Sequence, residues 1–200
     1  MVYDGNGTVR SPYEVGNVDQ LQCIEEQDRG SNYTLVSDID ASGTSEWKDG
    51  KGLDPIGNSS DEPSNGTFDG DGHEIKDLTI ERPDENGVGL FGFVGTDSMV
   101  TNVSVVDAKV EDNGTVGGLV GESYNSTVRD SSASGNVTVK EHRVDIFVRK
   151  GFVPQFLGNR FKGKLVGMGF GDTVRNSSAS GNVTFAHDGS QIPILTVSLF

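Results

Sequence analysis

The chain has 200 residues, of which 28 are Gly and only a third are hydrophobic, so its composition favours many turns and short strands over long helices. Thirty acidic residues against 16 basic ones give a net charge of −14, which repels nucleic-acid phosphates and anionic lipid surfaces. No stretch has the length and apolarity of a membrane-spanning helix. We therefore expect neither a nucleic-acid partner nor direct membrane insertion.

The acidic residues are mostly aspartates. The chain has 19 Asp and 11 Glu but only 8 Lys. This balance resembles proteins of salt-loving archaea, whose carboxylate-rich surfaces stay soluble in concentrated salt. The alternative interpretation is simply an acidic extracellular protein. Both interpretations place most of the carboxylates on the surface.

The first predicted element is a short helix over residues 18–27. Its apolar residues, Leu21 and Ile24 among them, recur at helical spacing, and Gly30 follows as a stop signal. We expect this helix to cover the open end of the strands that follow. Cys23 is the single cysteine and cannot form an internal disulfide, so we expect it to be a small buried side chain.

Two strand regions and a loop follow the helix. We expect a strand over residues 33–36 and Ile39, and a polar loop over residues 47–63. Residues 66–80 contain a Gly-rich turn that leads into Leu-Thr-Ile, which we expect to be the start of a repeating strand unit.

An internal repeat dominates the rest of the chain. Gly-Leu-Phe-Gly at residues 89–92 recurs as Gly-Leu-Val-Gly at 118–121 and as Lys-Leu-Val-Gly at 164–167. A second element follows each unit, and its copies at 128–137 and 174–183 are nearly identical and 46 residues apart. These intervals predict a repeat of about 28 residues and, before the third copy, an insertion of about 18.

A repeat of this length cannot bury its own apolar side, so we expect successive repeats to stack. Alternating valines within each repeat predict short strands, and the Gly-rich joints predict turns between them. The leucine of each Gly-Leu-Val-Gly unit is expected to point into a narrow core. These leucines are Leu90, Leu119 and Leu165.

One polar position is expected to stack in the same way. Asn102, Asp130 and Asn176 occur at the same point of their repeats. Stacked amides can form a hydrogen-bonded ladder at a turn. A polar row that binds a ligand is the alternative.

With these repeated units, the chain resembles the GLUG-motif family, whose repeats occur in bacterial and archaeal surface proteins and adhesins. Besides the repeated units, the resemblance rests on Ser11-Pro12-Tyr13, Tyr33-Thr34-Leu35, Asp38-Ile39-Asp40, Pro55-Ile56-Gly57 and Phe68-Asp69-Gly70-x-Gly72-His73-x-Ile75. It covers residues 8–140 and 164–185. The resemblance implies a β-helix-like fold and an extracellular, adhesive role, with no catalytic residues and no cofactor to transfer.

The predicted fold is all-β: a right-handed parallel β-helix, or β-solenoid, with short strands and a short N-terminal capping helix. We divide the chain into a lead-in and cap (1–64), GLUG-type coils (65–140), a basic aromatic insertion (141–163) and a last degenerate coil with its tail (164–200). The tail is apolar and has no capping coil, and no signal peptide is visible at the start. We therefore expect a fragment or truncated copy of a longer protein.

The insertion departs from the family pattern. Residues 140–164 hold seven of the 16 basic residues beside only Glu141 and Asp145, which gives a local charge of +5 (7 − 2). Four phenylalanines are interleaved with these charges: Phe147, Phe152, Phe156 and Phe161. A protruding loop that binds an acidic glycan is one hypothesis. The alternatives are a contact with the acidic body of the protein and a degraded coil.

Candidate metal sites are weak. Asp69 and Asp71 alternate with glycines like the start of a calcium loop, but His73 stands at the fifth position and no glutamate follows at the twelfth. We expect a Gly-rich turn there. The pair His73-Glu74 lacks the second histidine of a zinc-protease motif, because position 77 is Asp.

Glycosylation sequons are unusually frequent. Ten of the 13 asparagines are followed by x-Ser or x-Thr, far more than 33 Ser and Thr in 200 residues would produce by chance. Part of the excess follows from the repeats, which place Asn and Ser or Thr at turns. The candidate glycosylation sites are Asn6, Asn32, Asn58, Asn65, Asn102, Asn113, Asn125, Asn136, Asn176 and Asn182.

Three functions are compatible with these observations. The first is a non-catalytic adhesion or interaction module at the cell surface or in secreted form, whose partners are glycans or other surface proteins. The second is a structural stalk or spacer within a larger surface protein. The third, ranked last, is a carbohydrate-active β-helix enzyme, a polysaccharide lyase or hydrolase that uses paired carboxylates.

Overall fold

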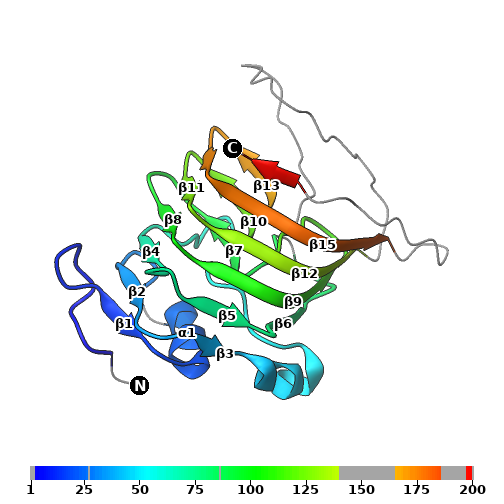
Figure 1. Cartoon of the computed structure of the whole chain (residues 1–200), viewed down its shortest axis with the longest axis horizontal. Helices are drawn as coiled ribbons and strands as arrows, with labels where there is room; N and C mark the ends of the chain where they lie inside the picture. The colour runs from blue at the N-terminus through cyan, green and yellow to red at the C-terminus, as the bar shows by residue number, and fades with distance from the viewer. Residues whose placement is uncertain (1–2, 27, 86, 140–164, 186–196, 200) are drawn as a thin grey trace.

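The computed structural model describes residues 3–26, 28–85, 87–139, 165–185 and 197–199. Their secondary structure consists mainly of short strands in three sheets, and all strand pairs but one are parallel (Figure 1). The six-stranded sheet runs in the order β1 (Tyr13–Val15), β2 (Tyr33–Leu35), β4 (Thr67–Asp69), β8 (Met99–Thr101), β11 (Thr127–Arg129) and β14 (Thr173–Arg175). The three-stranded sheet contains β7 (Phe91–Val94), β10 (Val120–Tyr124) and β13 (Val166–Phe170).

The seven-stranded sheet contains the longest strands of the protein. Its order is β3 (Ile39–Asp40), β5 (Glu74–Lys76), β9 (Ser104–Asp112), β12 (Ser132–Val139), β15 (Ser177–Phe185) and β16 (Val197–Leu199), and β6 (Thr79–Glu81) pairs with the second half of β9. Figure 1 shows β9, β12 and β15 side by side across the front of the molecule.

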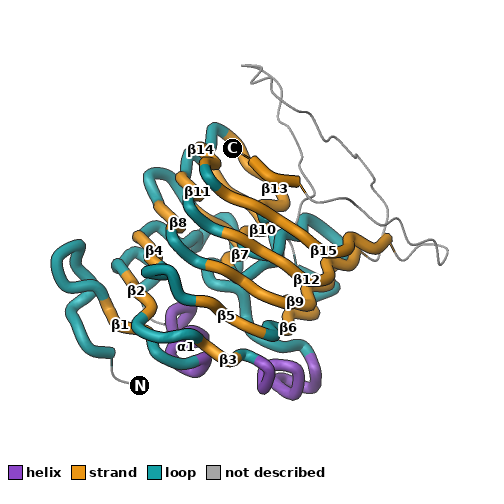
Figure 2. The backbone as a smooth tube through the Cα atoms, in the orientation of Figure 1, coloured by secondary structure: helices purple, strands orange, loops and turns teal. Residues whose placement is uncertain are grey.

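The chain visits the three sheets in a fixed order. It passes from the three-stranded sheet to the six-stranded sheet and then to the seven-stranded sheet, and it repeats this route as β7-β8-β9, β10-β11-β12 and β13-β14-β15. We call one such pass a coil. Figure 2 shows the strands of successive coils lying directly above one another. The prediction of a mostly β chain in parallel sheets is therefore confirmed, whereas the right-handed winding stays a prediction.

The register between coils follows the sequence repeat. Thr127 pairs with Met99, 28 residues earlier, and with Thr173, 46 residues later. The difference of 18 residues (46 − 28) is the predicted insertion, which falls in the connection between β12 and β13. Residues 140–164 themselves lie outside the described part of the chain.

The core lies between the three sheets. The predicted leucines Leu90, Leu119 and Leu165 are all buried, with exposed fractions of 0%, 0% and 6%. Phe68, Val100 and Val128 form another buried row, because parallel pairing in register stacks equivalent side chains.

Helix α1 (Val18–Glu26) forms where the sequence predicts it, and Leu21 and Ile24 anchor it in the core. It lies against residues 54–57, which in turn lie beside β7 through a bridge between Ile56 and Phe91. The Gly57 amide donates to Glu25 Oε2 at 2.6 Å, and the Asp54 amide donates to Gln22 Oε1 at 2.8 Å. The helix therefore satisfies backbone groups at this edge of the stack, as a cap must.

The buried carboxylate of Glu25 helps to hold helix α1 against residues 54–57. Its Oε1 accepts a hydrogen bond from Arg29 Nη1 at 2.9 Å, and only 8% of its side chain is exposed. Burial raises the pKa of Glu25, although the Gly57 amide and the Arg29 guanidinium both stabilise its charged form.

Several local expectations need correction. The predicted polar loop at residues 47–63 begins inside a 3-10 helix, η1 (Ser42–Gly50), and it contributes the fully buried Leu53 and Ile56 to the core. Cys23 is only partly buried. The tail was expected to leave the last coil without cover, but β16 pairs antiparallel with the first residues of β15 and covers part of its edge. The four-part division of the chain stays a prediction.

Candidate functional site

The corner between the six-stranded and seven-stranded sheets holds the stacked polar row. Asn102, Asp130 and Asn176 follow β8, β11 and β14 directly, and all three have left-handed backbone conformations with φ between 46° and 54°. Asn and Asp adopt this conformation more readily than most residues with a side chain. The turn therefore requires these residue types at this point of each coil.

Side chains of this row bond from coil to coil. Asn176 Nδ2 donates to Asp130 Oδ1 at 3.1 Å, and Asn102 Nδ2 donates to Asp69 Oδ1 at 3.0 Å. Of the predicted row, the rung between Asp130 and Asn176 is confirmed, whereas Asn102 bonds to Asp69 of the preceding turn instead of to Asp130. Adjacent serines add a further rung, in which Ser132 Oγ donates to Ser104 Oγ at 2.9 Å. The row ties the coils together.

The calcium candidates belong to this turn. Besides the Asn102 amide, Asp69 Oδ1 accepts the backbone N–H of Asp71 at 2.9 Å, and Asp71 itself has a φ of 48°. These bonds make a Gly-rich turn in which Asp69 orients the backbone. Across the described residues, no three His, Cys, Asp or Glu side chains are grouped as metal ligands.

His73 forms a surface contact near the same corner. Its Nδ1 lies 3.2 Å from Asp38 Oδ1, which also accepts the Glu74 backbone N–H at 3.1 Å. The Glu74 amide and then His73 hold the pKa of Asp38 below its ordinary value. This contact joins the β3 and β5 layers. His142 and His187 lie outside the described residues.

The ten sequons fall into different environments. In three of them the asparagine Nδ2 donates to another part of the chain: Asn32 to the Gly7 carbonyl at 3.0 Å, and Asn102 and Asn176 to carboxylates of a neighbouring coil. Asn113 is half-buried. The other six sequon asparagines are exposed: Asn6, Asn58, Asn65, Asn125, Asn136 and Asn182.

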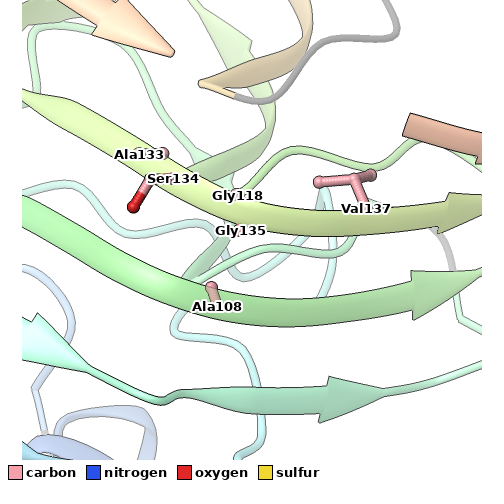
Figure 3. Close-up of a pocket in the computed structure, with 6 residues that line it drawn as sticks. All are labelled: Ala108, Gly118, Ala133, Ser134, Gly135 and Val137. Carbon is pink, nitrogen blue, oxygen red and sulfur yellow. The ribbon is translucent and has the colours of Figure 1, made fainter. Parts of the chain in front are cut away.

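A small hollow among the described residues offers no room for a ligand. A gap lined by Ala108, Gly118, Ala133, Ser134, Gly135 and Val137 leaves no room for a water-sized molecule (Figure 3). Gly135 is required there, because a Cβ at this position would lie 2.1 Å from the Ala108 carbonyl oxygen. The gap is a close approach of two strands rather than a site.

An aromatic pair on the three-stranded sheet was not expected from the sequence. Tyr124 ends β10 and Phe170 ends β13, and their rings stack at a centroid distance of 5.1 Å with only 8° between their planes. Tyr124 is 38% exposed, which is unusual for an aromatic side chain of this protein. Their spacing of 46 residues (170 − 124), equal to that of the near copies, is the signal that could have revealed the pair.

Comparison with known sequences connects the coil to a family. A profile described as "The GLUG motif" matches residues 112–138. The match begins at the end of β9, passes through β10 and β11 and ends in β12, so it corresponds to one coil. The second coil of this chain therefore contains a GLUG motif.

Two known proteins are similar in sequence to most of this chain. It is 42% identical over 140 residues to Halomucin of Haloquadratum walsbyi, a match that covers 68% of the chain but 2% of Halomucin. It is 32% identical over 124 residues to a Gly-rich membrane protein of Evansella cellulosilytica, covering 60% of the chain and 14% of that protein. The chain therefore spans only a small part of each relative.

A solved structure resembles the fold. A crystal structure of a protein named as an immunoglobulin A1 protease from Bacteroides ovatus superposes with a TM-score of 0.61 over 90% of this chain and 61% of the other. Because the two sequences are only 19% identical, this likeness concerns the fold alone.

The turn at Asp69 provides a test of the ladder. Replacing Asp69 by Ala removes the acceptor of two hydrogen bonds, and we expect the free energy of unfolding to fall by about 1 kcal/mol. Asp61 is exposed, and Asp61→Ala removes the same charge, so it is the matched control, expected to stay within about 0.5 kcal/mol of the parent. Urea unfolding of both variants at one salt concentration measures the difference. Equal losses would contradict the role assigned to Asp69.

Proposed function

We propose that this chain is a non-catalytic adhesion or interaction module of a longer protein at the cell surface. The observation that carries the proposal is the match between one GLUG motif and one coil, together with 42% identity to Halomucin across most of the chain. The names of the two relatives, Halomucin and a Gly-rich membrane protein, support a location at the cell surface.

The surface of the stack supports a role in contact rather than in chemistry. On the outer face of the seven-stranded sheet, Ser132, Ser134 and Asn136 of β12 pair in register with Ser178, Ser180 and Asn182 of β15. These side chains are partly or fully exposed and carry no charge, in a protein whose net charge is −14. These regular, uncharged polar rows suit repeated weak contacts.

We also propose that the coils wind in the right-handed sense. Successive strands of each sheet are parallel and are joined by crossovers through the other two sheets. Parallel crossover connections are right-handed in nearly all proteins, because of the twist of the strands.

Adhesion is tested directly with the purified chain. Beads coated with the chain should aggregate with cells of the organism that produces it, and free chain added in excess should disperse the aggregates, because soluble module competes for the same partner. Beads coated with an unrelated protein of equal net charge are the control for electrostatic sticking. Coated beads that aggregate no more than these control beads would instead favour the stalk or spacer function.

We further propose that the exported protein is glycosylated at the six exposed sequons named above, and not at the three whose asparagine Nδ2 donates a hydrogen bond to another part of the chain. Attachment at Asn32, Asn102 or Asn176 would disturb a hydrogen bond to another part of the chain, whereas the six exposed asparagines face solvent. Mass spectrometry of peptides from the native protein should find glycan on the exposed group and none on these three. Glycan on the three bonded asparagines, or on no asparagine at all, would contradict the proposal.

A further inference from the structure

The stacked pair of Tyr124 and Phe170 lies where the three-stranded sheet ends. Its ring planes are nearly parallel, and its position in the stack is fixed, because the two residues are register partners of parallel strands. Most aromatic rings of the described core are buried, Phe68 and Phe91 for example, but Tyr124 keeps 38% of its surface in solvent. A rigid, exposed ring of this kind is typical of binding surfaces.

Polar groups surround the ring. Glu122 Oε2 lies 3.4 Å from the Tyr124 hydroxyl, and the burial of the ring together with this carboxylate raises the pKa of Tyr124. The exposed Asn125 follows directly, and its carbonyl oxygen accepts the backbone N–H of Asp97 at 3.1 Å. The rim of the aromatic surface therefore carries the carboxylate of Glu122.

Hydrogen bonds to Asp172 hold the turn that follows Tyr124 in place. Asp172 Oδ1 accepts both the backbone N–H and the hydroxyl of Ser126, at 2.8 and 3.0 Å, and its Oδ2 accepts the Ser123 hydroxyl at 2.9 Å. These bonds join the second coil to the third on either side of Tyr124 and Asn125. A surface held in this way binds with little loss of conformational entropy.

We propose that the stacked rings of Tyr124 and Phe170, with the carboxylate of Glu122 at their rim, bind an uncharged sugar unit of a polysaccharide. The inference deepens the proposed adhesion function and rests on it, because it names the class of ligand that the module contacts.

The chemistry of the surface selects this ligand class. The face of a sugar ring carries C–H bonds with slight positive charge, which are attracted to the negative π-face of an aromatic ring. Sugar hydroxyls donate hydrogen bonds to carboxylates such as that of Glu122. Acidic sugars are disfavoured, because Glu122 would repel a carboxylate of the ligand and the whole chain carries a net charge of −14.

Binding of defined polysaccharides tests the proposal. The full chain should bind at least one of the neutral polymers dextran, mannan and chitin more tightly than the acidic polymer alginate at the same salt concentration. Tyr124→Ala should weaken that binding by about tenfold or more, because it removes the ring. Tyr124→Phe keeps the ring and should retain binding. Val36→Ala, which shortens a side chain that is 48% exposed, is the control.

A loss of folding must be separated from a loss of binding. Tyr124→Leu keeps an apolar side chain against Phe170 without a π-face, so it should lose sugar binding while its melting temperature stays near that of the parent. The site is wrong if Tyr124→Ala and Tyr124→Leu bind as Val36→Ala does, or if the parent binds alginate best or binds no neutral polymer. The bead assay is scored independently: coated beads that still aggregate cells in those cases leave the adhesion function standing.

Discussion

Backbone hydrogen bonds between successive coils determine the position of every other feature of this protein. Because the strands are parallel and in register, equivalent residues of each repeat lie above one another, about 4.8 Å apart. The same register buries the leucine and valine rows, brings the corner asparagines and aspartates within hydrogen-bond distance and stacks Tyr124 on Phe170. Core, ladder and aromatic surface are therefore consequences of one pairing scheme.

Most charged side chains of the described residues lie outside the core that this strand pairing forms. Most of the described carboxylates lie on the outside. The buried Glu25 bonds to Gly57 and Arg29, and the buried Arg82 pairs with Asp54. The outer rows of β12 and β15 carry no charge at their described positions. An acidic protein with an uncharged face and a fixed aromatic corner has defined places for contact, while the rest of its surface keeps it soluble.

Repetition is the part of the structure that the sequence reveals best. The near copies at residues 128–137 and 174–183 predict the register that the strands adopt, and the apolar spacing of Leu21 and Ile24 predicts the helix that covers one edge. Leu53 and Ile56 were missed, because a polar segment without periodicity gives no sign that it adds an edge to a sheet. The pair of Tyr124 and Phe170 was also missed, although its spacing of 46 residues equals that of the near copies.

The central claim, that the third coil pairs with the second across 46 residues, is tested most directly by engineered disulfides. In a Cys23→Ser background, Asn136→Cys with Asn182→Cys places two thiols on paired residues of β12 and β15, within the roughly 4.4–6.8 Å Cα separation that a disulfide needs. The pair Asn136→Cys with Ser180→Cys is offset by two residues, at a diagonal distance of about 7–8 Å. Mass spectrometry after mild oxidation should show a high yield of disulfide for the first pair and little for the second. Equal yields, or a higher yield for the offset pair, would contradict the register and with it the arrangement of the coils.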